Sequence, residues 1–216
     1  MVSHWSQWLG DKEPELLVIG QDFANVEYFE SHSGRDDPKN KTNENPRRSL
    51  QVAGFSVGQP PARDNTGKVY LANAILCMKV GRMNASIKAR WIDGCTQNHL
   101  LPLASYLGAP FVVGMGTAGW RAARKMFRLS YAPRLICVAA GTTWHGAAGR
   151  GVFAVGHCGS LGIANRSWSQ QVIDWQRIGD AVTGAFSFRV RTAERKRPAV
   201  TTSSFGAYES PSGRST

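Results

Sequence analysis

The sequence has no cysteine pair at Cys-x-x-Cys spacing and no apolar run near the roughly 20 residues that a membrane-spanning helix needs. Its histidines and scattered cysteines do not combine into a zinc spacing. We therefore expect no metal and no other cofactor, and we interpret the cysteines as buried thiols in a reducing compartment. The first residues also lack the basic start and long apolar core of a signal peptide, which predicts a cytoplasmic protein.

Acidic residues are scarce, because 15 Asp and Glu stand against 26 Lys and Arg, for a formal net charge of +11 over 216 residues. A charge so far from zero favours a polyanionic partner, first nucleic acid and second an anionic membrane surface. Of these we expect nucleic acid and no membrane, although a basic protein without such a partner is the plain alternative. The length is typical of one domain with a sizeable core, and we expect a monomer.

Strand-like and helix-like segments alternate along the chain. Short apolar runs predict buried strands at 16–19, 69–77, 110–115, 134–140 and 151–156. Helical spacing of apolar residues predicts helices near 26–29, 87–107, 116–127 and from a cap at Asn165 or Ser167 to about 182. This alternation predicts an α/β sandwich with a mostly parallel central sheet.

Two segments are strongly polar. The stretch 31–49 predicts a long loop, and such loops are usually functional or disordered. The stretch from 188 onwards is basic and rich in Ser, Thr and Gly, which predicts a disordered tail. The sequence thus divides into one domain over 1–187 and a tail over 188–216. The predicted helix 116–127 carries a basic face, which we interpret as a solvated surface rather than a DNA contact.

Three polar side chains end or interrupt the predicted strands: Asp22, Asn73 and His157. Because the carboxyl ends of parallel strands converge, these side chains and Phe55 are candidates for one pocket. An aromatic face, an amide, a carboxylate and an imidazole suit a flat heterocycle attached to a sugar. Singly, each residue has a structural alternative: a turn carboxylate, an amide bonded to backbone, a structural histidine and a core phenylalanine.

The order of four segments resembles the uracil-DNA glycosylase superfamily, over most of residues 16–180. Gly20–Asp22 resembles the start of the first motif, Gly-Gln-Asp-Pro-Tyr-His, and Gly54–Val57 resembles the segment that carries the base-stacking phenylalanine. Val69–Ala74 resembles the strand whose asparagine binds uracil, and His157–Gly162 resembles the second motif, His-Pro-Ser-Pro-Leu-Ser. The resemblance implies a three-layer α/β/α sandwich with a four-stranded, mostly parallel sheet.

The resemblance also implies roles for particular residues. Asp22 and His157 would be catalytic, Asp22 facing the sugar cation and orienting water and His157 donating to the base O2. Phe55 would stack on the extruded base and Asn73 would read its amide edge. Further residues follow from the same motifs: Gln21, Phe23 and Ala24 at the base, and Ser160, Leu161, Gly162 and Arg166 at the DNA, with Leu161 as the wedge that fills the gap in the duplex.

The sequence departs from the motifs at informative positions. Ala24 stands where the family has the tyrosine that excludes thymine, so the resemblance implies a looser pocket that accepts damaged bases beyond uracil. In the second motif, the two prolines and two serines are replaced by Cys158, Gly159, Ser160 and Gly162, which predicts a more flexible loop. The segment around Cys77 and Cys95 is similar to the iron–sulfur branches, but residues 1–22 contain no cysteine, so we expect no cluster.

The resemblance therefore implies a monofunctional DNA glycosylase that removes uracil, and other damaged bases, in the first step of base excision repair. Two other hypotheses remain open from the sequence. One is a non-catalytic binder of abasic or single-stranded DNA with the same fold, and the other is a different nucleotide- or nucleoside-binding α/β protein. The retention of Asp22, Asn73 and His157 together favours the enzyme.

Overall fold

The computed structural model describes residues 10–23, 25–33, 41–57, 68–78, 81–82, 85–134, 136–146 and 149–195. The chain divides into two compact units, Met1–Thr183 and Gly184–Thr216. The strands and the candidate site belong to the first unit. Ala24, one of the residues predicted to lie at the base, is outside the described residues.

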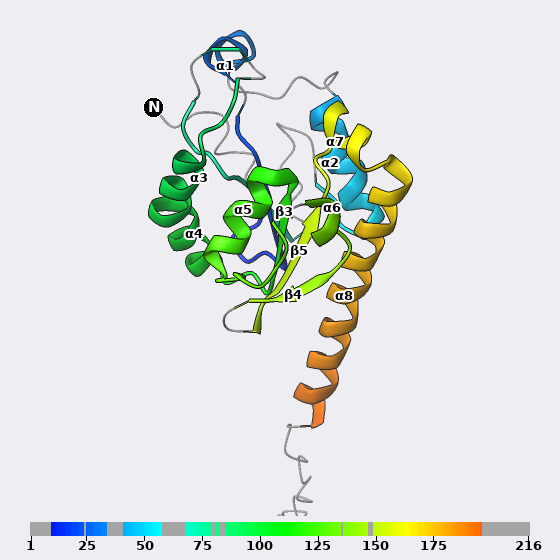
Figure 1. Cartoon of the computed structure of the whole chain (residues 1–216). Coiled ribbons are helices and arrows are strands. Elements are labelled where there is room, and N and C mark those ends of the chain that lie inside the picture. The colour runs from blue at the N-terminus through cyan, green and yellow to red at the C-terminus, as the bar shows by residue number, and fades with distance from the viewer. Residues whose placement is uncertain are drawn as a thin grey trace, which may run out of the picture. The chain divides into compact units, whose positions relative to one another are not determined.

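A five-stranded, mostly parallel sheet forms the centre of the first unit, with the strand order β2-β1-β3-β5-β4 (Figure 1). Four of its strands are mutually parallel: β1 (Leu16–Gly20), β2 (Val69–Asn73), β3 (Phe111–Met115) and β5 (Gly151–Val155). The edge strand β4 (Thr143–His145) pairs antiparallel with β5. The four-stranded sheet that the resemblance implied was therefore wrong by one strand, because β4 adds an antiparallel edge beside β5.

Alternate residues of β1 enter two separate apolar clusters, one on each face of the sheet. Leu17 and Ile19 pack in the first cluster, and Leu16 and Val18 pack in the second. On the first face lie α3 (Ala89–Cys95), the π-helical turn η3 (Thr96–Leu100), α4 (Leu101–Leu107) and α5 (Gly116–Met126). On the second lie α2 (Lys41–Val52) and α8 (Trp168–Arg195), through Leu50 and Trp175. Helices thus cover both faces, as the predicted sandwich requires.

The predicted helix over 87–107 is present but interrupted. The π-helical turn joins α3 to α4, at whose start Pro102 cannot donate a backbone hydrogen bond. The helix ends at Gly108, which has a left-handed φ of 62° that glycine adopts without strain. The predicted helix near 26–29 is α1 (Val26–Ser31).

Two predicted segments have a secondary structure other than the expected one. Part of the predicted loop 31–49 belongs to α2, because Asn45, Ser49 and Leu50 form a buried face in an otherwise polar segment. Part of the predicted strand 134–140 is the short helix α6 (Ile136–Ala139). Its last hydrogen bond runs from the Ala140 N–H to the Ile136 carbonyl, at 2.9 Å. A short apolar run does not distinguish a strand from a buried helix by periodicity alone.

The C-terminal helix is longer than its apolar spacing predicted. Of the two candidate caps, Ser167 accepts from the Gln170 N–H at 3.4 Å, and α8 begins at Trp168. The helix continues to Arg195, so the start of the predicted tail is helical, and residues 196–216 lie outside the described part. In the part of the chain that the structure describes, no helix has both the length and the apolar composition to cross a membrane.

Two glycines let α5 lie directly on the sheet. A Cβ at Gly119 would come within 2.1 Å of the Ile19 carbonyl oxygen on β1. A Cβ at Gly114 on β3 would come within 2.8 Å of the Gly119 carbonyl oxygen. Both distances are shorter than a side-chain carbon can tolerate, so the helix and the sheet touch backbone to backbone at this crossing.

Replacing Gly119 by Ala is expected to lower the free energy of unfolding by about 1–3 kcal/mol, the usual cost of overpacking. The matched control is Gly94→Ala in α3, where no heavy atom lies within 4 Å of the new Cβ. That substitution should instead stabilise by up to about 1 kcal/mol, from helix propensity. Urea denaturation of both variants measures the difference, and equal effects would contradict the close crossing.

Candidate functional site

The candidate site lies at the carboxyl edge of the sheet. Asp22 follows β1, Asn73 is the last residue of β2, and His157 follows β5. Since these strands are parallel, their ends share one edge, and β1 and β5 are both neighbours of β3. Two strand spacings make the ends of β1 and β5 about 10 Å apart, a distance that a nucleoside can bridge.

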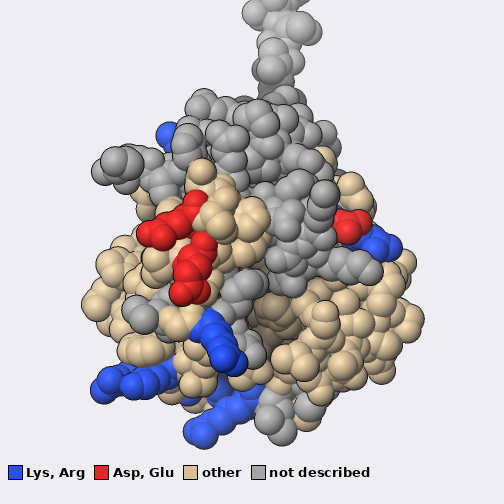
Figure 2. Space-filling model, turned by 90° about the horizontal axis from the view of Figure 1, so that it is seen from above, with Lys and Arg blue, Asp and Glu red and all other residues tan. Residues whose placement is uncertain are grey.

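Helices α1 and α7 (Ser160–Asn165) follow β1 and β5 and lie at the top of Figure 1, so Figure 2 views this edge from above. Lys and Arg side chains gather mainly at the lower left of that view, and acidic side chains lie above them on the left and beside a basic side chain at the right edge. The positive charge of the described surface is therefore unevenly placed on this face.

Asn73 lies against the end of β1. It pairs with Gly20 in the register of the two strands, and a Cβ at Gly20 would come within 2.6 Å of the Asn73 Oδ1. The pairing continues beyond the strands, where the Ile75 N–H donates to the Gln21 carbonyl at 3.0 Å. The absence of a side chain at Gly20 thus leaves the room that the Asn73 amide occupies next to Gln21 and Asp22.

Asp22 is half-buried and accepts a hydrogen bond from the Gln21 Nε2 at 3.3 Å. Its charge acts on the imidazole of His157. Burial lowers the pKa of His157, and the Asp22 carboxylate opposes this by raising it. The two side chains therefore influence one another electrostatically, although their strands are separated by β3.

His157 is held as a neutral imidazole with a defined tautomer. The backbone N–H of Gly159 donates to the His157 Nδ1 at 3.0 Å, so Nδ1 is an acceptor and the proton lies on Nε2. The lowered pKa, caused mainly by burial, keeps this form at neutral pH. The Nε2–H is consequently a hydrogen-bond donor that carries no charge.

Several residues hold the loop after β5, and sequence analysis identified none of them. Asn45 on α2 donates from Nδ2 to the Cys158 carbonyl at 2.8 Å, and Gln171 on α8 donates from Nε2 to the His157 carbonyl at 3.3 Å. Gly116 lies against the ring, since a Cβ there would come within 3.2 Å of the His157 Cδ2. A buried polar side chain far from its partner in sequence leaves no local pattern.

Cys158 is a buried part of the same loop. Burial raises the pKa of its thiol to about 12, so the side chain stays protonated and acts as a small apolar group. This agrees with our interpretation of the cysteine. Cys77 and Cys95 are also free thiols, but Cys77 is exposed and Cys95 half-buried, so the interpretation of all cysteines as buried was wrong for Cys77. The pKa of Cys77 is raised by partial desolvation and by neighbouring Cys95.

The predicted base-binding residues occupy different environments. Phe55 follows a turn at Gly54, where φ is +82°, and only 8 % of its surface is exposed. It packs in the apolar cluster that includes Met115 and Cys158, so both a stacking role and the core alternative stay open. Phe23 is half-buried.

The predicted DNA-contacting residues begin α7. Leu161 is 81 % exposed, Ser160 is exposed, and Gly162 packs so closely that a Cβ there would come within 1.9 Å of the His157 carbonyl oxygen. Single exposed apolar side chains are ordinary on protein surfaces, and Tyr106 is exposed to a similar degree, so the exposure alone does not indicate a partner. Its position beside the His157 loop suits the predicted wedge.

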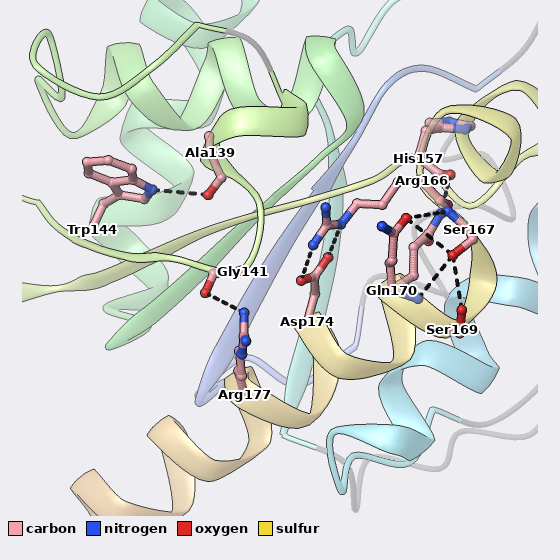
Figure 3. Close-up of polar contacts among 11 residues, drawn as sticks. Ala139, Gly141, Trp144, His157, Arg166, Ser167, Ser169, Gln170, Asp174 and Arg177 are labelled. Atoms are coloured by element: carbon pink, nitrogen blue, oxygen red, sulfur yellow. Dashed lines mark hydrogen bonds and ion pairs between the residues drawn. The ribbon is translucent and has the colours of Figure 1, made fainter.

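Arg166 has a partner inside the protein. Its guanidinium makes a two-fold ion pair with the fully buried Asp174 of α8, through Nε to Oδ2 and through Nη2 to Oδ1 at 2.6 Å (Figure 3). The Arg166 carbonyl also accepts from the Gln171 Nε2 at 3.0 Å. These contacts tie the end of α7 to α8, and the predicted DNA contact of Arg166 stays a prediction.

No group of three or more His, Cys, Asp or Glu side chains that could hold a metal occurs within the described residues. The chain matches no protein-family model and no curated protein. The assignment to the uracil-DNA glycosylase superfamily therefore rests on the motifs alone and stays a prediction.

The pKa of His157, followed by NMR of the ring, should lie below 6.5, with the neutral Nε2–H tautomer present at pH 7. As pH drops below about 6.5, His157 becomes protonated in the unfolded chain before it does in the folded chain. The free energy of unfolding should therefore fall with decreasing pH in this range. Asp22→Asn should lower the pKa of His157 further, since it removes the charge that raises it.

Glu13→Gln is the matched control for that measurement, because Glu13 is an exposed carboxylate on the segment before β1. It should leave the pKa of His157 unchanged. An unchanged value in Asp22→Asn as well would show that the two side chains do not share a site.

Proposed function

We propose that this chain is a monofunctional DNA glycosylase that hydrolyses the N-glycosidic bond of uracil in DNA and leaves an abasic site. The observation that carries the proposal is the electrostatic coupling of Asp22 with a neutral His157 at one edge of the sheet. A carboxylate and an uncharged donor that follow two strands about 10 Å apart suit the two ends of a breaking nucleoside bond. DNA as partner, a cytoplasmic location and base excision repair follow from this proposal as expectations.

Asp22 acts at the sugar. As the glycosidic bond lengthens, its electron pair leaves with the base and positive charge grows on the sugar, which the Asp22 carboxylate stabilises. A water molecule oriented by Asp22 then bonds through its oxygen to C1′, and the proton that it loses passes to solvent. Stabilising charge where it develops is the largest contribution that a preorganised site makes.

His157 acts at the base. The departing base carries the electron pair as an anion delocalised onto its O2, and the Nε2–H of His157 donates to that oxygen. The Gly159 N–H on Nδ1 and the burial of the ring support this role, because both favour a neutral donor that keeps its proton. Hydrogen bonds to an ionised acceptor are about twice as strong as neutral ones.

Asn73 and Phe55 supply recognition in this proposal. The amide of Asn73, next to Gln21 and Asp22, offers both a donor and an acceptor to the edge of the base. Phe55 provides an aromatic face for stacking, which is worth roughly 1–3 kcal/mol per base in nucleic-acid sites. Exposed Leu161 fills the gap that base extrusion leaves in the duplex.

An oligonucleotide with a single uracil, treated with alkali after incubation, tests the activity. Asp22→Asn should slow base release by about 10²–10⁴-fold, the usual contribution of a positioned catalytic group. Glu13→Gln, which also converts a carboxylate to an amide, should leave the rate unchanged. Tight binding to an abasic site without base release by the unaltered protein would favour the non-catalytic binder and overturn the proposal.

Gly20→Ala should separate base recognition from chemistry. The new methyl group would displace the Asn73 amide, since it would lie 2.6 Å from Oδ1. We expect weaker substrate binding, with KM raised about tenfold for the loss of one hydrogen bond. An unchanged KM would contradict the recognition role of Asn73.

The range of bases should be broader than uracil, because Ala24 stands where the resembled motif has its thymine-excluding tyrosine. A panel of oligonucleotides, each with one modified base, measures this range. We expect release of a deaminated purine or a 5-substituted uracil at a rate comparable to uracil. Ala24→Tyr should suppress release of 5-substituted bases and keep that of uracil, whereas strict release of uracil by the unaltered chain would contradict the looser pocket.

A further inference from the structure

A concave site lies beside α5, and none of the residues proposed for catalysis lines it. It is a pocket of about 650 Å³ between α3, α5 and the segment 129–134. Its volume falls within the range of small-ligand sites. The polar side chains that line it are Asp93, Thr117, Arg121, Arg124, Lys125, Arg128, Ser130 and Arg134.

Positive charge dominates this pocket. Asp93 is the single carboxylate of its described lining, and it is bonded to Arg121 through Nε–Oδ1 at 3.1 Å and Nη2–Oδ2 at 2.8 Å. Its Oδ1 also lies 3.7 Å from the Lys125 Nζ. The hydrogen bond from Arg121 is the main cause that lowers the pKa of Asp93, so this carboxylate stays ionised and occupied. Its negative charge neutralises one of the five positive charges in the lining, so a net positive charge remains.

Arg124 has a buried donor atom without a hydrogen-bond partner among the described residues. This atom is its Nε, and its Nη2 lies 3.5 Å from the Ser130 carbonyl oxygen. Burial lowers the pKa of Arg124, and the nearby charges of Arg134 and Arg121 lower it further. A half-buried guanidinium among like charges is costly unless an anion neutralises it. The sequence had favoured a solvated face here.

We propose that this pocket binds phosphate groups. Guanidinium groups match phosphate oxygens in geometry and charge. The one carboxylate of the described lining, Asp93, is bonded to Arg121, so the lining offers no other carboxylate to Arg124, Arg128 and Arg134. No aromatic ring lines the pocket, and Leu129 is its one apolar side chain in the described lining, so nothing there would hold a nucleobase. The ligand is recognised through its phosphates, which belong either to a free oligophosphate or to a nucleic-acid backbone. This binding does not depend on the proposed glycosylase activity.

Inorganic pyrophosphate is the probe for the first source, with binding measured by calorimetry on the full chain. Arg124→Gln should weaken its binding about tenfold, the loss expected for one hydrogen bond to a charged group. Arg90→Gln is the matched control, because Arg90 is an exposed arginine on α3 outside the lining. It removes the same charge and should leave the affinity unchanged.

An undamaged duplex is the probe for the second source. If the pocket holds a backbone phosphate, Arg124→Gln should weaken duplex binding and reduce the slope of log K against log salt by about 0.9, the contribution of one phosphate contact. Arg90→Gln should not change this slope. If Arg124→Gln weakens binding of one probe and Arg90→Gln does not, the proposal is supported. The probe that is affected, pyrophosphate or duplex, then identifies the source of the phosphate.

Arg134→Gln protects the test against misfolding, because Arg134 is exposed at the pocket while Arg124 is half-buried. Thermal unfolding shows that each variant is folded, and pyrophosphate should raise the midpoint of the unaltered chain by mass action if it is the ligand. The proposal is overturned if Arg124→Gln and Arg134→Gln bind both probes as tightly as Arg90→Gln does.

Discussion

A single hydrogen bond, from the Gly159 N–H to the Nδ1 of His157, sets the chemistry of the candidate site. It determines which ring nitrogen carries the proton, and burial keeps the ring uncharged. The bond requires the loop after β5 to keep its conformation. Asn45 from α2 and Gln171 from α8 hold that loop by its carbonyl groups, so the helices on one face of the sheet determine the protonation of a side chain at its edge.

The described structure uses its positive charge in two distinct ways. At the carboxyl edge, Arg166 is paired with the buried Asp174, and the charge of Asp22 acts on the imidazole of His157. Along α5, Arg124 and its neighbours converge on one pocket with a single carboxylate in its described lining. The proposed hydrolysis does not use this concentration of positive charge, whereas a bound phosphate group would neutralise it.

Much of the parallel sheet could be predicted from apolar runs, because strands buried on both faces must be apolar throughout. The same reasoning failed at Ile136–Ala139, where a run of similar composition forms a helix. It also failed at α2, whose buried face rests on Asn45 and Ser49 rather than on a regular apolar stripe. A polar residue that is buried through a hydrogen bond to Cys158, 113 positions away, has no signature in its own segment.

For the site, the sequence by itself determined which chemical groups are present and that they follow buried strands: a carboxylate at 22, an amide at 73 and an imidazole at 157. Only the tertiary structure decided that Asp22 acts on His157, that Gly20 leaves room for Asn73, and that Arg166 turns inward to Asp174. The reason is physical: residue type carries chemical capacity, whereas protonation state, tautomer and ion pairing depend on neighbours that strand order and helix packing bring together from distant parts of the chain.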